Sequence, residues 1–212
     1  MPILEDKVLK DVEKALQNMK KEVRLIFFKT SGECKYCKET QELLEEVQGT
    51  NKLLKLEIHQ IEDDKEAVKQ YGVDKTPAIV VAGEKDYGIR FYGIPAGYEF
   101  SSLLSAILMV STGVHKLSED GQKFLNNLAR PIHLQVFVTP TCPYCPKAVI
   151  LAQQMAYYSD KVKADMVEVS EFPDLGKKYS VQGVPRTVIN EDWFQEGAAP
   201  ENMLIEKIKE AL

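Results

Sequence analysis

The sequence predicts an α/β protein built from two tandem units, each with a central mixed sheet flanked by helices. Three observations support this prediction. The chain has 212 residues, a length that accommodates two small domains. Short runs of β-branched and aromatic residues alternate with helical patterns along the whole chain. The same order of motifs occurs twice, because the Cys-x-x-Cys motif at Cys34 recurs 108 positions later at Cys142, and Pro77 recurs at the same offset as Pro185.

Three strands are expected in each unit. The strand before each cysteine pair is rich in β-branched and aromatic residues, which indicates burial. The second strand alternates apolar residues with polar ones, and the third begins at the repeated proline. These strands are expected over 23–29, 54–58 and 77–81 in the first unit, and over 132–139, 162–166 and 185–189 in the second.

Helices are expected from apolar residues spaced three and four apart. One helix precedes the first strand of each unit, one starts at the cysteine pair, a polar one leads to the third strand, and an apolar one closes the unit. Ser118 followed by Glu119 has the composition of a helix start. Cys37 and Cys145 fall on the apolar stripes of their helices, so both side chains should face inward. The remaining helices are expected over 6–19, up to Tyr71, over 100–110 and 118–129, up to Tyr179, and over 203–212.

Each cysteine pair has the spacing of a dithiol that can close into a disulfide, since residues three apart in a helical turn lie close together. We place Cys34 and Cys142 at or next to the helix N-cap. There, free N–H groups and the helix dipole lower a thiol pKa from ~8.5 into the range ~3.5 to 7.5. Pro143 would then occupy the first helical position, which suits proline. Pro146 would fall at the fourth position, where it removes a first-turn hydrogen bond.

The charge distribution excludes several classes of protein. Net charge is −5, and residues 1–116 carry 17 basic and 19 acidic side chains against 10 and 13 in residues 117–212. Neither part has the basic excess of a nucleic-acid binder. The longest apolar stretch, Leu103 to Val110, is far shorter than the ~20 residues of a membrane-spanning helix. We see no secretory signal and expect a cytoplasmic protein without membrane partners.

A strand that ends in Cys-x-x-Cys at a helix start, with a strand-opening proline 40 residues after the second cysteine, resembles the thioredoxin superfamily. Two such units with intact dithiols resemble the protein disulfide oxidoreductases of thermophilic archaea and bacteria. The resemblance divides the chain into an N-terminal unit, 1–114, and a C-terminal unit, 115–212. It implies thiol–disulfide exchange that forms, reduces or isomerises protein disulfides. The catalytic residues would be Cys34, Cys37, Cys142 and Cys145.

The same resemblance implies that Pro77 and Pro185 are cis and lie opposite the dithiols. The preceding residues, Thr76 and Val184, would bind the backbone of an extended substrate. The expected partners are proteins with thiols or disulfides and a flavoprotein similar to thioredoxin reductase. The redox-active disulfides would be the only redox groups, with no cofactor and no metal.

Two other functions remain open on the sequence. One is an electron-transfer module that passes reducing equivalents to a peroxidase, although two complete dithiols count against it. The other is a non-enzymatic four-cysteine metal site. In such sites the pairs are usually ~15 to 20 residues apart, whereas 104 residues lie between Cys37 and Cys142.

Other polar and aromatic side chains carry weaker expectations. Glu168 is a candidate proton acceptor for Cys145, but a structural role is favoured because its offset partner, Gln60, cannot ionise. Trp193 and Phe194 are expected to pack a hairpin end. Three histidines show no partner in the sequence and are expected to be structural: His59, His115 and His133.

Overall fold

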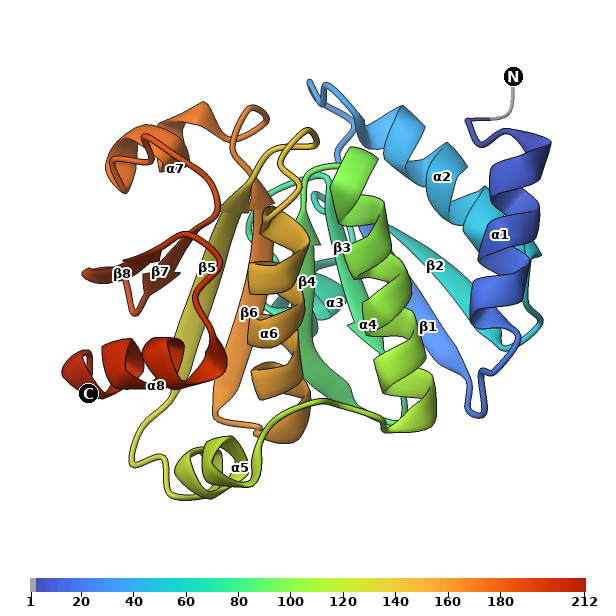
Figure 1. Ribbon diagram of the computed structural model, residues 1–212. Helices are drawn as coiled ribbons and strands as arrows, with labels where there is room; N and C mark the ends of the chain where they lie inside the picture. Colours follow the sequence, from blue (N-terminus) through green and yellow to red (C-terminus); the bar gives the residue numbers. More distant parts are fainter. Residues whose placement is uncertain (1–2) are drawn as a thin grey trace.

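The computed structural model describes residues 3–212 as eight strands in one continuous sheet with helices on both faces (Figure 1). The strands are β1 (Val23–Lys29), β2 (Leu54–Gln60), β3 (Ala78–Ala82), β4 (Asp86–Tyr92), β5 (Ile132–Val138), β6 (Val162–Glu168), β7 (Arg186–Ile189) and β8 (Trp193–Glu196). They lie in the order β2-β1-β3-β4-β6-β5-β7-β8. The predicted α/β class and the tandem repeat are confirmed, since both halves of the sheet have the same strand order.

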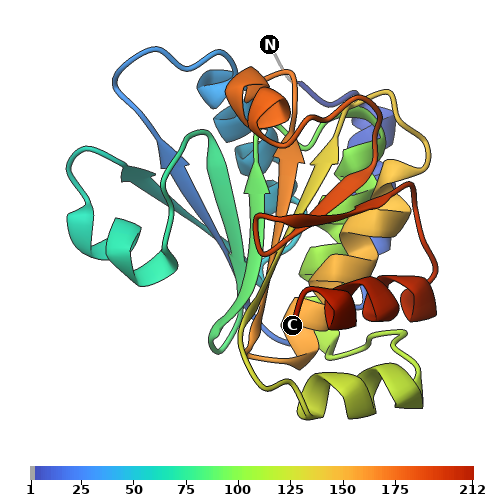
Figure 2. The ribbon, with the colours of Figure 1, turned by 90° about the vertical axis from the view of Figure 1, so that its left-hand side faces the viewer.

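The helices divide unequally between the two faces. They are α1 (Asp6–Leu16), α2 (Cys37–Gly49), α3 (Lys65–Tyr71), the short 3-10 helix η1 (Gly97–Glu99), α4 (Phe100–Thr112), α5 (Glu119–Asn126), α6 (Cys145–Tyr158), α7 (Pro173–Lys178) and α8 (Glu201–Glu210). The larger core lies under α1, α2, α4, α5, α6 and α8. A smaller core lies under α3 and α7, and α3 is seen on the opposite side of the sheet from α4 and α6 (Figure 2). None of the helices in residues 3–212 is long and apolar enough to cross a membrane.

The sheet is continuous because β4 of the first unit pairs in parallel with β6 of the second. Neither β4 nor β8 was expected from the sequence, which predicted only three strands in each unit. β4 pairs with β3 and β8 with β7, both antiparallel, so each is the fourth strand of its unit. The two units are therefore joined by backbone hydrogen bonds as well as by the packing of α4 against α6. The predicted N-cap is confirmed, because the Ser118 side chain accepts a hydrogen bond from the N–H of Gly121.

A second contact between the units lies beyond the end of β4. The N–H of Tyr98 in η1 donates to the carbonyl oxygen of Pro140, in the loop that precedes Cys142. Gly97 has a φ of +59°, and a Cβ at this position would overlap that same carbonyl oxygen. Only glycine allows both the left-handed backbone and the close approach. The end of the first unit is thus held against the cysteine loop of the second.

We expect Gly97→Ala to destabilise the protein by several kcal/mol, because it adds a steric clash to the ~1–2 kcal/mol that a left-handed backbone costs an alanine. Gly197→Ala is the matched control. Gly197 has a similar φ of +72°, but no atom lies within 4 Å of its added Cβ. Urea unfolding of both variants isolates the clash, and equal losses of stability would contradict the close approach of η1 to Pro140.

Candidate redox-active site

Both cysteine pairs are closed disulfides at the same end of the sheet. Cys34–Cys37 follows β1 and Cys142–Cys145 follows β5, and each pair has a Cα–Cα distance of 5.5 Å. The strand pairings make β1 and β5 parallel to one another, so their C-terminal ends point the same way. The predicted dithiol spacing therefore gives two disulfides on one side of the molecule.

The first cysteine of each pair lies outside its helix. The helices α2 and α6 begin at the second cysteine, with Tyr36 and Tyr144 as N-cap residues. The expectation that Cys34 and Cys142 lie at or next to the N-cap is wrong, because each lies two residues before it. The later start also removes the difficulty with Pro146, which occupies the second helical position, where its missing N–H has no partner within the helix.

The helix terminus nevertheless acts on the first cysteine. The backbone N–H of Cys145, at the start of α6, points at the Sγ of Cys142, with an N–S distance of 3.1 Å. A backbone donor at this position stabilises a thiolate there, as does the positive end of the helix dipole. The predicted cause of thiol activation therefore acts on Cys142 although this residue lies two positions before the N-cap.

The cysteines differ in burial, and the second of each pair faces inward, as expected. Cys145 is fully buried and Cys37 is 8% exposed. Cys142 is 7% exposed, whereas Cys34 is only half-buried. The first cysteine is thus more accessible in the first unit than in the second.

The two repeated prolines are cis, as the family resemblance implies. Both the Thr76–Pro77 and the Val184–Pro185 peptide bonds have this geometry. In the second unit, the Sγ of Cys142 lies 3.7 Å from the carbonyl oxygen of Val184. The residue before the proline therefore faces the disulfide of the second unit.

A buried carboxyl group that the sequence analysis did not single out lies beside the second disulfide helix. Glu99, in η1, is 1% exposed, and neither carboxylate oxygen has a hydrogen-bond partner among the described residues. Burial raises the pKa of Glu99 from 4.5 to about 7, although the Ser102 hydroxyl acts in the opposite direction. Glu99 thus belongs to a segment of the first unit, η1, that packs against the helix beginning at Cys145.

Two more carboxyl groups lie between the disulfides. Glu168 is buried and accepts hydrogen bonds from the N–H groups of Ser170 and Glu171, which fits the structural role favoured for it. Glu171 accepts a hydrogen bond of 2.7 Å from the N–H of Ile94 in the first unit. Burial and the neighbouring Glu168 raise the pKa of Glu171 to about 7. Both line a pocket of about 490 Å³ together with Tyr36 and Pro140.

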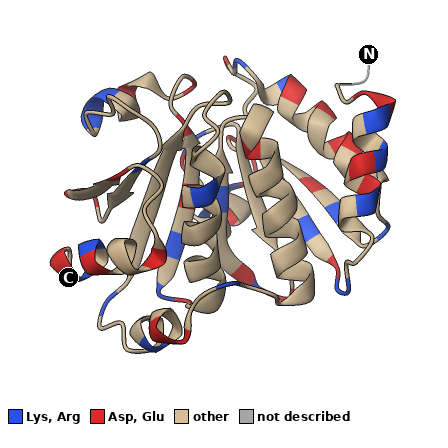
Figure 3. Cartoon of the chain, in the orientation of Figure 1, with Lys and Arg blue, Asp and Glu red and all other residues tan. Residues whose placement is uncertain are grey.

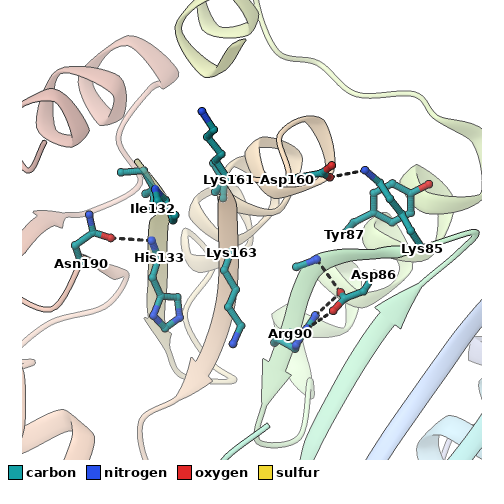
Figure 4. Close-up of a pocket in the computed structure, with 13 residues that line it drawn as sticks. Lys85, Asp86, Tyr87, Arg90, Ile132, His133, Asp160, Lys161, Lys163 and Asn190 are labelled. Carbon is teal, nitrogen blue, oxygen red and sulfur yellow. Dashed lines mark hydrogen bonds and ion pairs between the residues drawn. The ribbon is translucent and has the colours of Figure 1, made fainter. Parts of the chain in front are cut away.

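A pocket of about 570 Å³ lies at the opposite end of the sheet, where β4, β5 and β6 begin (Figure 4). Its Arg90 guanidinium lies 2.5 Å from Asp86. The expectation that His133 has no partner is wrong, because its Nε2 lies 2.6 Å from the carboxylate of Asp165. These charged groups pair with one another and with the backbone, far from the cysteines. The pocket is therefore separate from the redox site.

Other residues singled out in the sequence take structural positions. His59 Nδ1 lies 3.3 Å from Asp64, so this histidine also has a partner. Trp193 and Phe194 are 41% and 45% exposed in the edge strand β8, which is more open than the packed hairpin expected. Within residues 3–212 there is no group of three or more His, Cys, Asp or Glu side chains that could hold a metal ion.

Comparison with known proteins identifies relatives along most of the chain. The sequence model of the family described as Thioredoxin domain matches residues 19–105 and 132–210. The crystal structure of a protein disulfide oxidoreductase from Aeropyrum pernix has a TM-score of 0.91 and 28% sequence identity, covering 98% of this chain and 93% of that one. The NTD_N/C domain of alkylhydroperoxide reductase from Enterococcus faecalis has a TM-score of 0.89 and 26% identity, covering 97% and 99% of the two chains.

The curated sequence relatives are longer proteins. A component of the alkyl hydroperoxide reductase of Staphylococcus aureus is 27% identical over 184 residues, which are 86% of this chain but 33% of its own length. A protein of Ferdinandcohnia aciditolerans named NADH dehydrogenase is 29% identical over 143 residues, 66% of this chain and 27% of its own length. The chain thus spans a third or less of the length of these relatives.

We expect Glu99→Gln to change how stability depends on pH. Between the ordinary pKa of 4.5 and the folded value of about 7, folded Glu99 keeps a proton that the unfolded chain has released, so wild-type stability falls as pH rises. Glutamine lacks this dependence. Between about pH 5 and pH 8, the free energy of unfolding of the variant should therefore rise relative to that of wild type by up to about 3 kcal/mol.

Urea unfolding of the oxidised proteins across that range measures the difference. Glu66→Gln, at an exposed position in α3, is the control and should follow wild type. If the curves of wild type and Glu99→Gln stay parallel, the carboxyl group of Glu99 is not buried in the folded protein.

Proposed function

The chain belongs to the Thioredoxin domain family, and from this membership we propose that it is an oxidoreductase that catalyses thiol–disulfide exchange in protein substrates. One observation carries the proposal. In each unit a closed Cys-x-x-Cys disulfide lies at a helix start, in a fold that also contains a cis proline. A pair of sulfurs with this geometry cycles between dithiol and disulfide with little movement of the backbone. The similarity to the Aeropyrum pernix protein disulfide oxidoreductase over nearly the whole chain supports the same function.

In the proposed reductive reaction, the thiolate of Cys34 or Cys142 attacks one sulfur of a substrate disulfide. A mixed disulfide forms, and the other substrate sulfur leaves as a thiolate that takes up a proton. Cys37 or Cys145, once deprotonated, then attacks the enzyme sulfur and releases the second substrate thiol. The reverse sequence of steps donates a disulfide to the substrate, so one site can form, reduce or rearrange disulfides.

We propose that Glu99 accepts the proton that the Cys145 thiol must lose before it attacks the mixed disulfide. A fully buried thiol has no water at hand to accept its proton, and burial also disfavours the thiolate. Glu99 is buried, lies in η1, which packs against the same helix, has no hydrogen-bond partner among the described residues, and has a pKa raised to about 7 by burial. A group poised near neutral pH can accept and return a proton efficiently. In this proposal the first unit completes the redox site of the second.

The proposed substrate is an extended polypeptide segment beside the cis prolines. Thr76 and Val184 would offer backbone hydrogen bonds to it, and the position of Val184 against Cys142 supports this assignment. We divide the enzyme into a unit of residues 1–114 and a unit of residues 115–212, each with one dithiol.

For the electron source, we propose a flavoprotein similar to thioredoxin reductase. Two relatives support a link to reductases, since one is named NADH dehydrogenase and the other is a component of an alkyl hydroperoxide reductase. We propose that the protein acts in the cytoplasm of a thermophile, where intracellular proteins carry disulfides and such an enzyme has substrates.

A second candidate function is electron transfer to a peroxidase. The similarity to the Staphylococcus aureus alkyl hydroperoxide reductase component over 86% of the chain favours it. Two complete dithiols favour the broader exchange activity, because a simple relay needs only one. The two functions can be distinguished by comparing rates with a peroxidase and a reductase present. Peroxide reduction that is much faster than insulin reduction would favour the relay.

We expect the wild-type protein to reduce insulin and to refold a scrambled disulfide protein. Cys34→Ser and Cys142→Ser should each remove the activity of one unit, because serine cannot form the mixed disulfide. The double variant should fall to the uncatalysed rate. Turbidity and recovered activity measure the two reactions. The absence of both reactions in wild type would rule out the enzyme.

The two dithiols should differ in reduction potential. Lys35 adds a positive charge beside Cys34, whereas Pro143 follows Cys142 without an N–H group, and Cys142 is the more buried of the two. Each potential is measured in the variant that lacks the other site, by equilibration with glutathione. Dithiols of this type span ~150 mV, and a difference of ~30 mV already corresponds to about 1.4 kcal/mol. A single shared value would contradict the asymmetry.

A further inference from the structure

Glu171 lies where the two units meet, although it belongs to the second. Its Oε1 accepts a hydrogen bond of 2.7 Å from the backbone N–H of Ile94, in the first unit. The neighbouring Gly93 has a φ of +93°, and a Cβ at this position would lie 2.7 Å from the same oxygen. Glycine leaves the space that the carboxyl group occupies. The backbone of the first unit therefore holds this side chain in place.

The loop that carries Glu171 is also held from its own side. Glu168 is 3% exposed, and its two carboxylate oxygens accept hydrogen bonds from the N–H groups of Ser170 and Glu171. The second oxygen of Glu171, Oε2, is buried without a hydrogen-bond partner among the described residues. Burial and a neighbouring negative charge both disfavour the ionised form, and they raise the pKa of Glu171 to about 7.

The pocket of about 490 Å³ beside Glu171 borders the first redox site. Tyr36, which lies within the first Cys-x-x-Cys motif, and Glu39, in the first turn of α2, line it together with Glu171. The Lys35 ammonium lowers the pKa of Glu171 and the Glu39 carboxylate raises it, so charges at the start of α2 act on this carboxyl group. A negative charge on Cys34, adjacent to Lys35 in the chain, would act in the same direction as that of Glu39.

Few other charged groups lie in this part of the seam between the units. The helices α4 and α6, which pack against each other there, carry a single charged residue, Lys147, and are almost uncoloured in Figure 3. The charges that act on Glu171 are those of Glu168 in its own loop and of Lys35 and Glu39 in the first unit. A new charge at the first dithiol therefore has little competition.

We propose that Glu171 takes up a proton when the disulfide of the first unit is reduced to a Cys34 thiolate. In this step a dithiol reductant gives up two electrons and two protons and becomes a disulfide. The Cys34–Cys37 bond breaks, one proton goes to the sulfur of Cys37, and the other goes to Glu171. The total charge is unchanged, because a carboxylate disappears as the thiolate forms. The proposal rests on the thiol–disulfide exchange proposed above and gives the second unit a part in the chemistry of the first.

Glu171 acts in this proposal as a positioning residue, through its charge and without contact with the sulfur. The coupling is reciprocal, since a thiolate makes Glu171 harder to ionise and ionised Glu171 makes the thiolate less stable. Well below pH 7, Glu171 is protonated in both redox states and does not oppose the thiolate. As pH rises through about 7 to 8, the carboxylate forms, and reduction of the first disulfide becomes less favourable.

Carboxyl ¹³C NMR of the full chain tests the proposal directly. The background Cys142→Ser/Cys145→Ser keeps only the first dithiol, and Glu171→Gln identifies the resonance of Glu171. Dithiothreitol reduces the disulfide. We expect the pKa of Glu171 to rise on reduction by about 0.5, a roughly threefold change in proton affinity. Coulomb's law gives this size for a unit charge at ~10 Å with an effective dielectric constant of ~50. Adding Cys34→Ser removes the thiolate, and Glu171 should then titrate as in the oxidised protein.

The equilibrium with dithiothreitol gives an independent measurement in the same background. The equilibrium constant for reduction should fall by about threefold more between about pH 6 and pH 8 when Glu171 is present than in Glu171→Gln. Glu99 titrates in the same range, but it is present in both proteins, so its effect cancels. Asp174→Asn removes an exposed carboxylate in the following helix, α7, and should behave as the protein with Asp174 does. Matching backbone amide spectra show that the variants are folded.

Three results would overturn the proposal: equal pKa values of Glu171 in the two redox states, an equal rise with Cys34→Ser, or parallel pH curves with and without Glu171. Dithiothreitol acts on the disulfide directly, so these results do not depend on a protein substrate. A protein that reduces insulin without this coupling keeps its proposed function. A protein that shows the coupling but does not reduce insulin keeps the coupling and loses the proposed function.

Discussion

The pairing of β4 with β6 is the constraint on which the rest of the structure depends. It joins two four-stranded sheets in parallel, with Ile89 opposite Ala164 and Tyr92 opposite Val167. Because of this pairing, β1 and β5 run in the same direction and both disulfides lie at one end of the sheet. It also carries the chain beyond β4 to the loop before Cys142, which positions η1 against the second unit.

This arrangement makes the two redox sites unequal although their motifs repeat. The second site has the Val184 carbonyl beside the sulfur of its first cysteine, which is nearly buried, and its helix α6 packs against η1 of the first unit. The first site has a more exposed cysteine and borders the pocket that contains Glu171 of the second unit. The two sites therefore differ in exposure and in neighbouring groups although their motifs repeat.

Most of the fold could be predicted from the sequence, because local patterns determine it. The strands 23–29 and 132–138, the helices after each cysteine pair and the cap at Ser118 follow from composition and spacing. The strands β4 and β8 were missed, and the role of β4 depends on a partner about 75 residues away in the chain, which local periodicity does not reveal. The helix starts were misplaced by two or three residues, since the turn between the cysteines is compatible with helix by composition.

The candidate site was predictable only where it is local. The cysteines and prolines are adjacent to recognisable elements, so their positions follow from the repeat. The carboxyl of Glu99 becomes significant only through burial between the units. The pair of His133 with Asp165 forms across neighbouring strands and joins residues 32 positions apart. Such contacts depend on tertiary packing. For Glu99, the one signal in the sequence was its position as a single glutamate before an uncharged helix.

The burial of the strands that join the two units makes each unit depend on the other. The joined strands β4 and β6 are largely buried, whereas the outer strand β2 is mostly half-buried and β8 is mostly exposed. Half of the molecule, on its own, would present the unpaired N–H and C=O groups of a largely buried strand to any similar chain, which favours aggregation. The two halves can therefore differ in the chemistry around their disulfides, but each needs the other to cover this edge of its sheet.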